Sequence, residues 1–160
     1  MRALTSAQPA TRHSTWVDAA PFRAHVRHAV EAAAVPWPAV AVATGVSLPA
    51  VHALLVGRAG RPQTRIEPRM AGRLLRVGAG DLIAMRSLRV PAARTGARLR
   101  NLLAAGVDPL WVARWCQIGL NELTLLVDGE ATSCTQLTET LGLAAQRLRQ
   151  TDACWPPLAA

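Results

Sequence analysis

Apolar residues recur three and four positions apart along most of this chain, which is the spacing of amphipathic helices. Phe22, Val26 and Val30 form the first such stripe. Residues 1–20 show no period, and we expect them to form a flexible N-terminal segment. The composition, rich in Ala, Leu and Arg, also favours helices, so we expect an all-α protein.

Small and rigid residues mark the ends of the next two predicted helices. Pro36 and Pro38 suit the opening turn of a helix, where a missing N–H costs little. Gly45 permits the positive φ of a tight turn. Ser47 is a typical N-cap residue, and Gly57 can end the helix that it starts. The sequence therefore predicts two short helices, the second over residues 47–56, joined by a tight turn.

The segments that follow are less regular. Residues 58–66 read as a loop, and Pro68 then opens a further helix with apolar and basic faces. Residues 78–93 form a short connector with room for one short helical piece.

The same plan recurs 72 residues further on. Val40 corresponds to Val112, and Leu54 corresponds to Leu126. Matches at one fixed offset predict a repeated structural unit. The sequence thus predicts two helix-turn-helix repeats in tandem, over residues 21–90 and 91–160. Near the end, Ser133 and Gln136 have capping-box spacing, which predicts a last helix after Ser133.

The charge is concentrated in the first repeat. Residues 1–90 carry 12 Arg and 4 acidic residues, whereas residues 91–160 carry 6 of each, so the formal net charge of +8 belongs to the first half. A strong basic excess is typical of proteins that bind nucleic acids. We therefore expect an anionic partner on the first repeat.

A helix-turn-helix unit reads the major groove with the start of its second helix and grips phosphates with flanking basic residues. The helix at 47–56 would supply the reading positions, and the Arg-rich segment 58–76 would hold the backbone. The expected DNA-binding residues are Ser47, Pro49, Ala50, His52, Ala53, Arg58, Arg61, Thr64, Arg65, Arg69 and Arg73.

The second repeat departs from this pattern. Gln117 stands where the first repeat has Gly45, and Gly119 stands where it has Ser47. Its outward face carries acidic residues, which repel phosphate, so we expect it to support the first repeat or to contact protein. Trp111, Trp115 and Leu125 would form a protein interface, with a homodimer as one outcome.

The chain resembles the tandem helix-turn-helix proteins of actinobacteria and their phages over roughly residues 22–157. The resemblance rests on VAVATGVSLPAVHALLVGR, on the RI…MAGRLLRV helix, on ARLRNLLAAGV and on the terminal CWPP. It implies double-stranded DNA binding, as in a transcription regulator or a phage-type repressor.

Other chemistry has weak signals. Cys116, Cys134 and Cys154 lack metal or disulfide spacing, which favours reduced thiols in a cytoplasmic protein. His25 and His28 have no third ligand nearby, so we expect no metal and no cofactor. No pattern typical of an enzyme and no membrane segment is present, which favours a cytoplasmic, nucleoid-associated protein.

One alternative stays open. The repeats would then be scaffold only, in a protein-protein interaction module such as an adaptor, an antitoxin-like partner or an anti-activator.

Overall fold

The computed structural model describes residues 15–151, and this part of the chain is mostly helical. The predicted helical class is confirmed, although two small two-stranded sheets accompany the helices. The first half contains β1 (Val17–Asp18), α1 (Ala20–Ala33), α2 (Trp37–Thr44), α3 (Leu48–Val56), β2 (Arg65–Ile66), α4 (Pro68–Leu74) and α5 (Ala79–Ala84). The second half contains β3 (Arg89–Pro91), α6 (Ala93–Ala104), α7 (Pro109–Cys116), α8 (Leu120–Asp128), β4 (Ser133–Thr135) and α9 (Gln136–Gln150).

The element bounds recur at the offset found in the sequence. α2 and α7 begin and end 72 residues apart, and so do α3 and α8. The turn between each pair also has the same backbone conformation, because Gly45 has φ 66° and Gln117 has φ 55°. Gln117 therefore adopts the left-handed conformation that Gly45 adopts without side-chain strain.

The strands were not predicted. Val17 pairs with Ile66 and Asp18 with Arg65 in an antiparallel sheet of β1 and β2, so the expectation of an irregular segment fails for residues 17–20. Residues 1–14 lie outside the described part. In the second half, β3 pairs antiparallel with β4, with Val90 opposite Cys134. Each strand pair joins the segment before a helix triplet to the segment after it.

Local signals fixed most of the helix starts. Pro68 is the first residue of α4, as expected, and the Asp18 side chain accepts a hydrogen bond from the Ala20 N–H at the start of α1. The predicted start of the last helix is wrong. Thr135, rather than Ser133, caps α9 by accepting from the Thr138 N–H at 3.0 Å, because Ser133 lies in β4.

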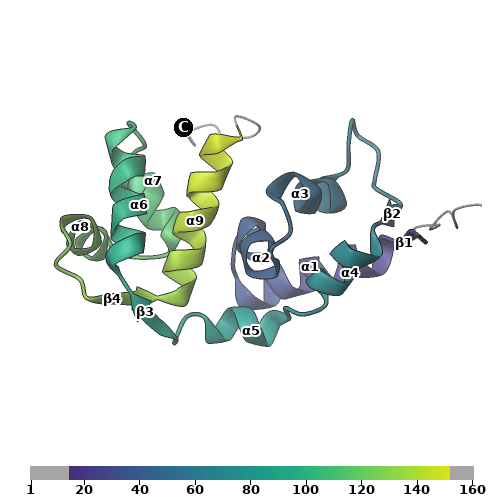
Figure 1. The fold of residues 1–160 in the computed structure, drawn as a ribbon, viewed down its shortest axis with the longest axis horizontal. Coiled ribbons are helices and arrows are strands. Elements are labelled where there is room, and N and C mark those ends of the chain that lie inside the picture. The colour runs from purple at the N-terminus through teal and green to yellow at the C-terminus, as the bar shows by residue number, and fades with distance from the viewer. Residues whose placement is uncertain (1–14, 152–160) are drawn as a thin grey trace, which may run out of the picture.

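The two halves share one hydrophobic core. α9 of the second half packs against α2 of the first half. Buried residues from Val26 in α1 to Leu148 in α9 belong to a single cluster. Figure 1 shows α6–α9 as one group beside α1–α4, with α5 along one edge and the segment between α3 and β2 projecting outward. Across residues 15–151, no helix has the length and apolar character needed to cross a membrane.

Candidate functional site

Helix α3 lies between two hollows of the surface. We call the first the α4 groove; it has a volume of about 570 Å³ and lies between the α2–α3 turn and α4. The second, the α9 hollow, has a volume of about 280 Å³ and lies between α3 and α9. Arg58 lines both. The two faces of α3 therefore meet different surroundings.

The α4 groove is the cationic one. Its lining includes Gly45, Ser47, Ala50, Arg58, Arg69 and Arg73. Glu67 is its one acidic lining residue. The groove therefore brings together backbone, a hydroxyl and three guanidinium groups, which is a set that can hold anionic oxygens.

A tight hairpin carries two of the expected arginines beside this groove. The N–H of Arg58 donates to the carbonyl of Arg61, and the N–H of Arg61 donates back, both at 3.0 Å. Ala59 and Gly60 between them have φ 49° and 74°, as in a type I′ turn. A Cβ at Gly57 would lie 2.2 Å from the Arg61 carbonyl oxygen, so the hairpin can close only on a glycine there. The sequence had predicted a plain loop over 58–66.

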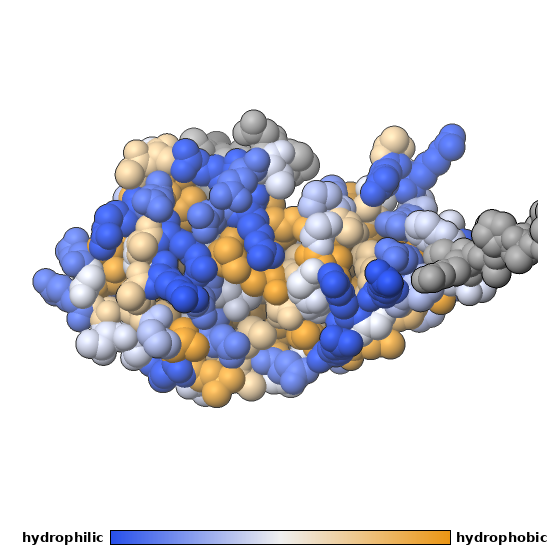
Figure 2. Space-filling view, viewed as in Figure 1, coloured by the Kyte–Doolittle hydropathy of each residue, from blue (hydrophilic) through white to orange (hydrophobic). Residues whose placement is uncertain are grey.

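The base of this hairpin is anchored to the start of α1. The Arg23 side chain donates to the Gln63 carbonyl and to the Leu54 carbonyl, the latter at 2.7 Å. The Ala19 N–H donates to the Thr64 carbonyl at 2.9 Å. The hairpin is thus a projecting, braced element, and Figure 2 shows hydrophilic side chains standing out in the region where Figure 1 draws this segment.

Among residues 15–90, half of the arginines stabilise the fold through hydrogen bonds of their side chains. Among residues 15–90, five of the ten arginines donate a side-chain hydrogen bond to another residue. In four of them the acceptor is a carbonyl in the last turn or at the cap of a helix, where the helix dipole favours a cation. These arginines are Arg23, Arg27, Arg73, Arg86 and Arg89.

The other five guanidinium groups have no hydrogen bond or ion pair within the described residues. Four of them, Arg58, Arg61, Arg65 and Arg69, lie on the hairpin, β2 and the first turn of α4, and Arg76 follows α4. All are exposed. The expected phosphate-contacting arginines are therefore largely the ones that remain available, except Arg73, which also donates to the Gly45 carbonyl at 3.0 Å.

The expected reading face of α3 is divided between the two hollows. Ser47 and Ala50 line the α4 groove, whereas Pro49, His52 and Ala53 line the α9 hollow. The outward position predicted for Ala53 is wrong, because Ala53 is only 3% exposed. His52 is half-buried, with its ring 5.7 Å from that of Trp37.

Ser47 occupies the predicted N-cap position but not the predicted role. Its backbone is extended, as at an N-cap, yet its hydroxyl makes no capping hydrogen bond. Ser47 is exposed, as are Pro49 and Thr64. The Ser47 hydroxyl therefore faces the groove without a bond to the start of α3.

The second half presents a different surface. Trp111 and Trp115 stack with ring centroids 5.1 Å apart, and the Trp115 indole N–H donates to the Leu141 carbonyl at 2.8 Å. Both rings are half-buried, so they pack largely within the fold. Leu125, the third residue of the predicted interface, is 44% exposed, and Leu110 and Leu120 are also exposed.

The remaining candidate groups are the cysteines and the two histidines of α1, and Cys116 and Cys134 are buried. Burial, and secondarily the neighbouring Cys134, raises the pKa of the Cys116 thiol to about 12. Burial also raises the pKa of Cys134. His25 has its Nε2 3.0 Å from the Val77 carbonyl, and His28 is exposed. Cys154 lies outside the described residues.

Sequence reasoning missed the α9 hollow altogether. Trp37 and Leu148 form its walls although they are more than a hundred positions apart, and only the packing of α9 against α2 brings them together. No local pattern signals such a contact.

The chain was compared with known proteins at three levels. No protein-family model matches it, no curated protein matches it, and no solved structure matches it.

Proposed function

We propose that the first half of this protein binds double-stranded DNA through the α4 groove and the 58–61 hairpin. The observation that carries the proposal is the gathering of available guanidinium groups around one end of α3. Arg58 and Arg69 line the groove, and Arg61 and Arg65 lie on the adjoining hairpin and strand. A spaced set of cations suits the phosphates of a duplex better than a single small anion.

In this proposal the pairs α2–α3 and α7–α8 are helix-turn-helix units in tandem, as in the actinobacterial and phage proteins that the sequence resembles. Their identical spacing and the shared left-handed turn residue support it. Ser47 and Ala50 then face the bases, and the arginines set position on the backbone. Because phosphate contacts carry little sequence information, the protein binds duplex DNA with high affinity but with little preference between sequences.

The biological role proposed is transcription regulation, as a repressor of bacterial or phage type acting at the nucleoid. The second half is proposed as the partner-binding side, through the exposed Leu110, Leu120 and Leu125. A second copy of the chain is the partner we propose there, which would place two α4 grooves on one duplex.

The same exposed leucines also favour the alternative function of a protein interaction module with no DNA contact. Fluorescence anisotropy with a labelled random duplex separates the two functions. We expect binding whose logarithm falls linearly with the logarithm of salt concentration. No binding even at low salt, with a protein partner retained instead, would favour the interaction module.

Paired variants locate the DNA surface. Arg61→Gln with Arg69→Gln should flatten the salt slope by about 2, since each phosphate contact contributes about 0.9. Arg94→Gln with Arg147→Gln removes the same charge from exposed positions of the second half, and should leave the slope unchanged. An equal loss in both double variants would mean that net charge alone, rather than the α4 groove, determines binding.

A further inference from the structure

The α9 hollow has the character of a small-molecule site. Its volume of about 280 Å³ is close to the lower end of the range of ligand pockets, about 300–1,000 Å³. The walls are mostly apolar, from Leu48, Pro49 and Ala53 on α3 and Leu148 on α9. It also lies where the two halves of the fold meet, which is a common place for ligands to bind.

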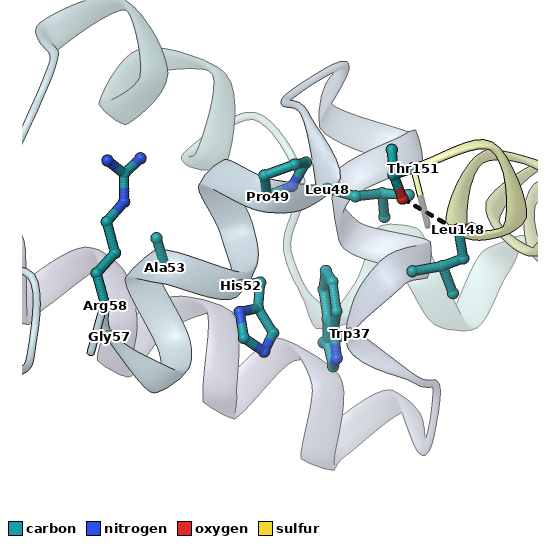
Figure 3. Close-up of a pocket in the computed structure, with 9 residues that line it drawn as sticks. All are labelled: Trp37, Leu48, Pro49, His52, Ala53, Gly57, Arg58, Leu148 and Thr151. Atoms are coloured by element: carbon teal, nitrogen blue, oxygen red, sulfur yellow. Dashed lines mark hydrogen bonds between the residues drawn. The ribbon is translucent and has the colours of Figure 1, made fainter. Parts of the chain in front are cut away.

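One wall offers aromatic surface. The indole of Trp37 and the imidazole of His52 lie 5.7 Å apart with their planes inclined at 53°. Both rings line the hollow, and both are half-buried (Figure 3). Aromatic rings favour offset or tilted contacts with one another, so this pair can take a third flat group against an exposed ring face or edge.

The hollow has few polar lining groups, and Arg58 is the one Arg, Lys, Asp or Glu among its lining residues. Arg58 stands at the end opposite Leu148 and Thr151, as Figure 3 shows. Its guanidinium has no hydrogen bond or ion pair within the described residues, and no acidic residue lines the hollow. The Thr151 hydroxyl is already used, because it donates to the Leu148 carbonyl at 2.9 Å. An apolar body with an anionic end complements this lining.

We propose that the α9 hollow binds a small aromatic carboxylate. Its ring lies against Trp37 and His52. Figure 3 shows the Arg58 guanidinium directed away from these rings, so in the bound state the exposed Arg58 side chain turns toward the ligand and pairs with its carboxylate, a charge-assisted contact that carboxylates favour. This assignment stands apart from DNA binding, since it rests on the lining of the hollow alone.

The position of Arg58 gives the site a second consequence, which rests on the proposed function. Arg58 lines the α9 hollow and the α4 groove together. A carboxylate bound on one side neutralises a cation that DNA phosphates would use on the other. The small acid therefore weakens DNA binding and acts as an inducer.

Titration calorimetry of the full chain with indole-3-acetate, in the absence of DNA, tests the site. We expect saturable binding, with weaker binding of the neutral indole-3-acetamide. Arg58→Gln should weaken binding of the acid about tenfold, equivalent to about 1.4 kcal/mol. Arg61→Gln is the matched control, because Arg61 lies on the same hairpin but does not line the hollow. In NMR spectra, the ring signals of Trp37 and His52 should move with the acid.

Three results would overturn the assignment. The first is that indole-3-acetate does not bind at millimolar concentration. The second is that the amide binds with equal affinity, which would indicate that an apolar side chain of a polypeptide occupies the hollow. The third is that Arg61→Gln weakens binding of the acid as much as Arg58→Gln does. The effect of the acid on DNA binding is measured separately. If the acid binds but duplex affinity does not fall, the coupling is wrong. If the acid binds and no duplex binding occurs without it, the proposed function fails and the site stands.

Discussion

Arg100 on α6 donates a hydrogen bond from its Nε to the carbonyl oxygen of Val127, 2.9 Å away in the last turn of α8. Arg27 on α1 makes the corresponding bond in the first half, to the Leu55 carbonyl at 3.1 Å. The two arginines are 73 positions apart and the two acceptors 72. The repeat therefore conserves a brace between its first and third helices, in addition to its buried residues.

Removing the Arg100–Val127 hydrogen bond should lower the stability of the fold while leaving the rest of α6 unchanged. We expect Arg100→Ala to lower the free energy of unfolding by about 1 kcal/mol, because it leaves a helix-terminal carbonyl without its cationic donor. Arg94→Ala, on the same helix, has no such partner among the described residues and serves as the control. Urea unfolding followed by circular dichroism measures both. Equal effects would show that the Val127 contact contributes nothing specific.

Helices α6 and α8 cross closely at Gly96. A Cβ at Gly96 would lie 2.2 Å from the Leu126 carbonyl oxygen, a backbone atom that cannot move aside freely. Gly96→Ala should therefore destabilise the fold by about 1–3 kcal/mol, as overpacking does. Gly72→Ala on α4 meets nothing within 4 Å and should be neutral or stabilising, by up to about 1 kcal/mol. Thermal unfolding separates them, and an unharmed Gly96→Ala would contradict the close crossing.

Alkaline stability reports on the buried thiols. The chain has neither Tyr nor Lys, so between pH 9 and pH 12 its cysteines dominate the side-chain titration. An unfolded Cys116 loses its proton near pH 9, whereas the folded thiol keeps it up to about pH 12. The folded state thus binds more protons in this window, and its stability falls as pH rises.

We expect Cys116 to contribute a loss of about 1.4 kcal/mol per pH unit above its unfolded pKa. Cys116→Ala should remove this part of the slope, and the raised pKa of Cys134 should leave a remainder. Urea unfolding at a series of alkaline pH values provides the measurement. An unchanged slope in Cys116→Ala would show that this thiol titrates alike in both states.

The proposed interface also predicts which residue of α3 affects sequence preference. The sequence alone pointed to His52, but His52 packs against Trp37 in the α9 hollow, and Ser47 lines the α4 groove. We therefore expect Ser47→Ala to alter the sequences selected from a random duplex pool, and His52→Ala to leave the selection unchanged. The reverse outcome would mean that DNA meets the other face of α3.

The sequence predicted the features that local chemistry controls. Gly45 and Gly57 fall where the α2–α3 turn and the end of α3 lie, and the offset of 72 residues matches the bounds of both helix pairs. Two-residue strands such as β1 escaped prediction because they have no period to detect. The division of α3 between two hollows also escaped prediction, because the α9 hollow forms only where α9, about a hundred positions away, packs near α2 and α3.

The choice among arginines could not be read from the sequence either. Arg23 and Arg27 look as available as Arg61 in a list of charges, but they reach the carbonyls of Leu54 and Leu55. Only the folded chain shows which guanidinium groups are committed to helix ends.

The central claim is that duplex DNA meets the α4 groove of the first half. Titration of the ¹⁵N-labelled protein with a short duplex, followed by amide chemical shifts, tests it most directly. We predict that the shifts concentrate at residues 45–50 and 58–73, and that the amides of α7 and α8 stay in place. Shifts confined to residues 109–128, or none at any DNA concentration in low salt, would contradict the account.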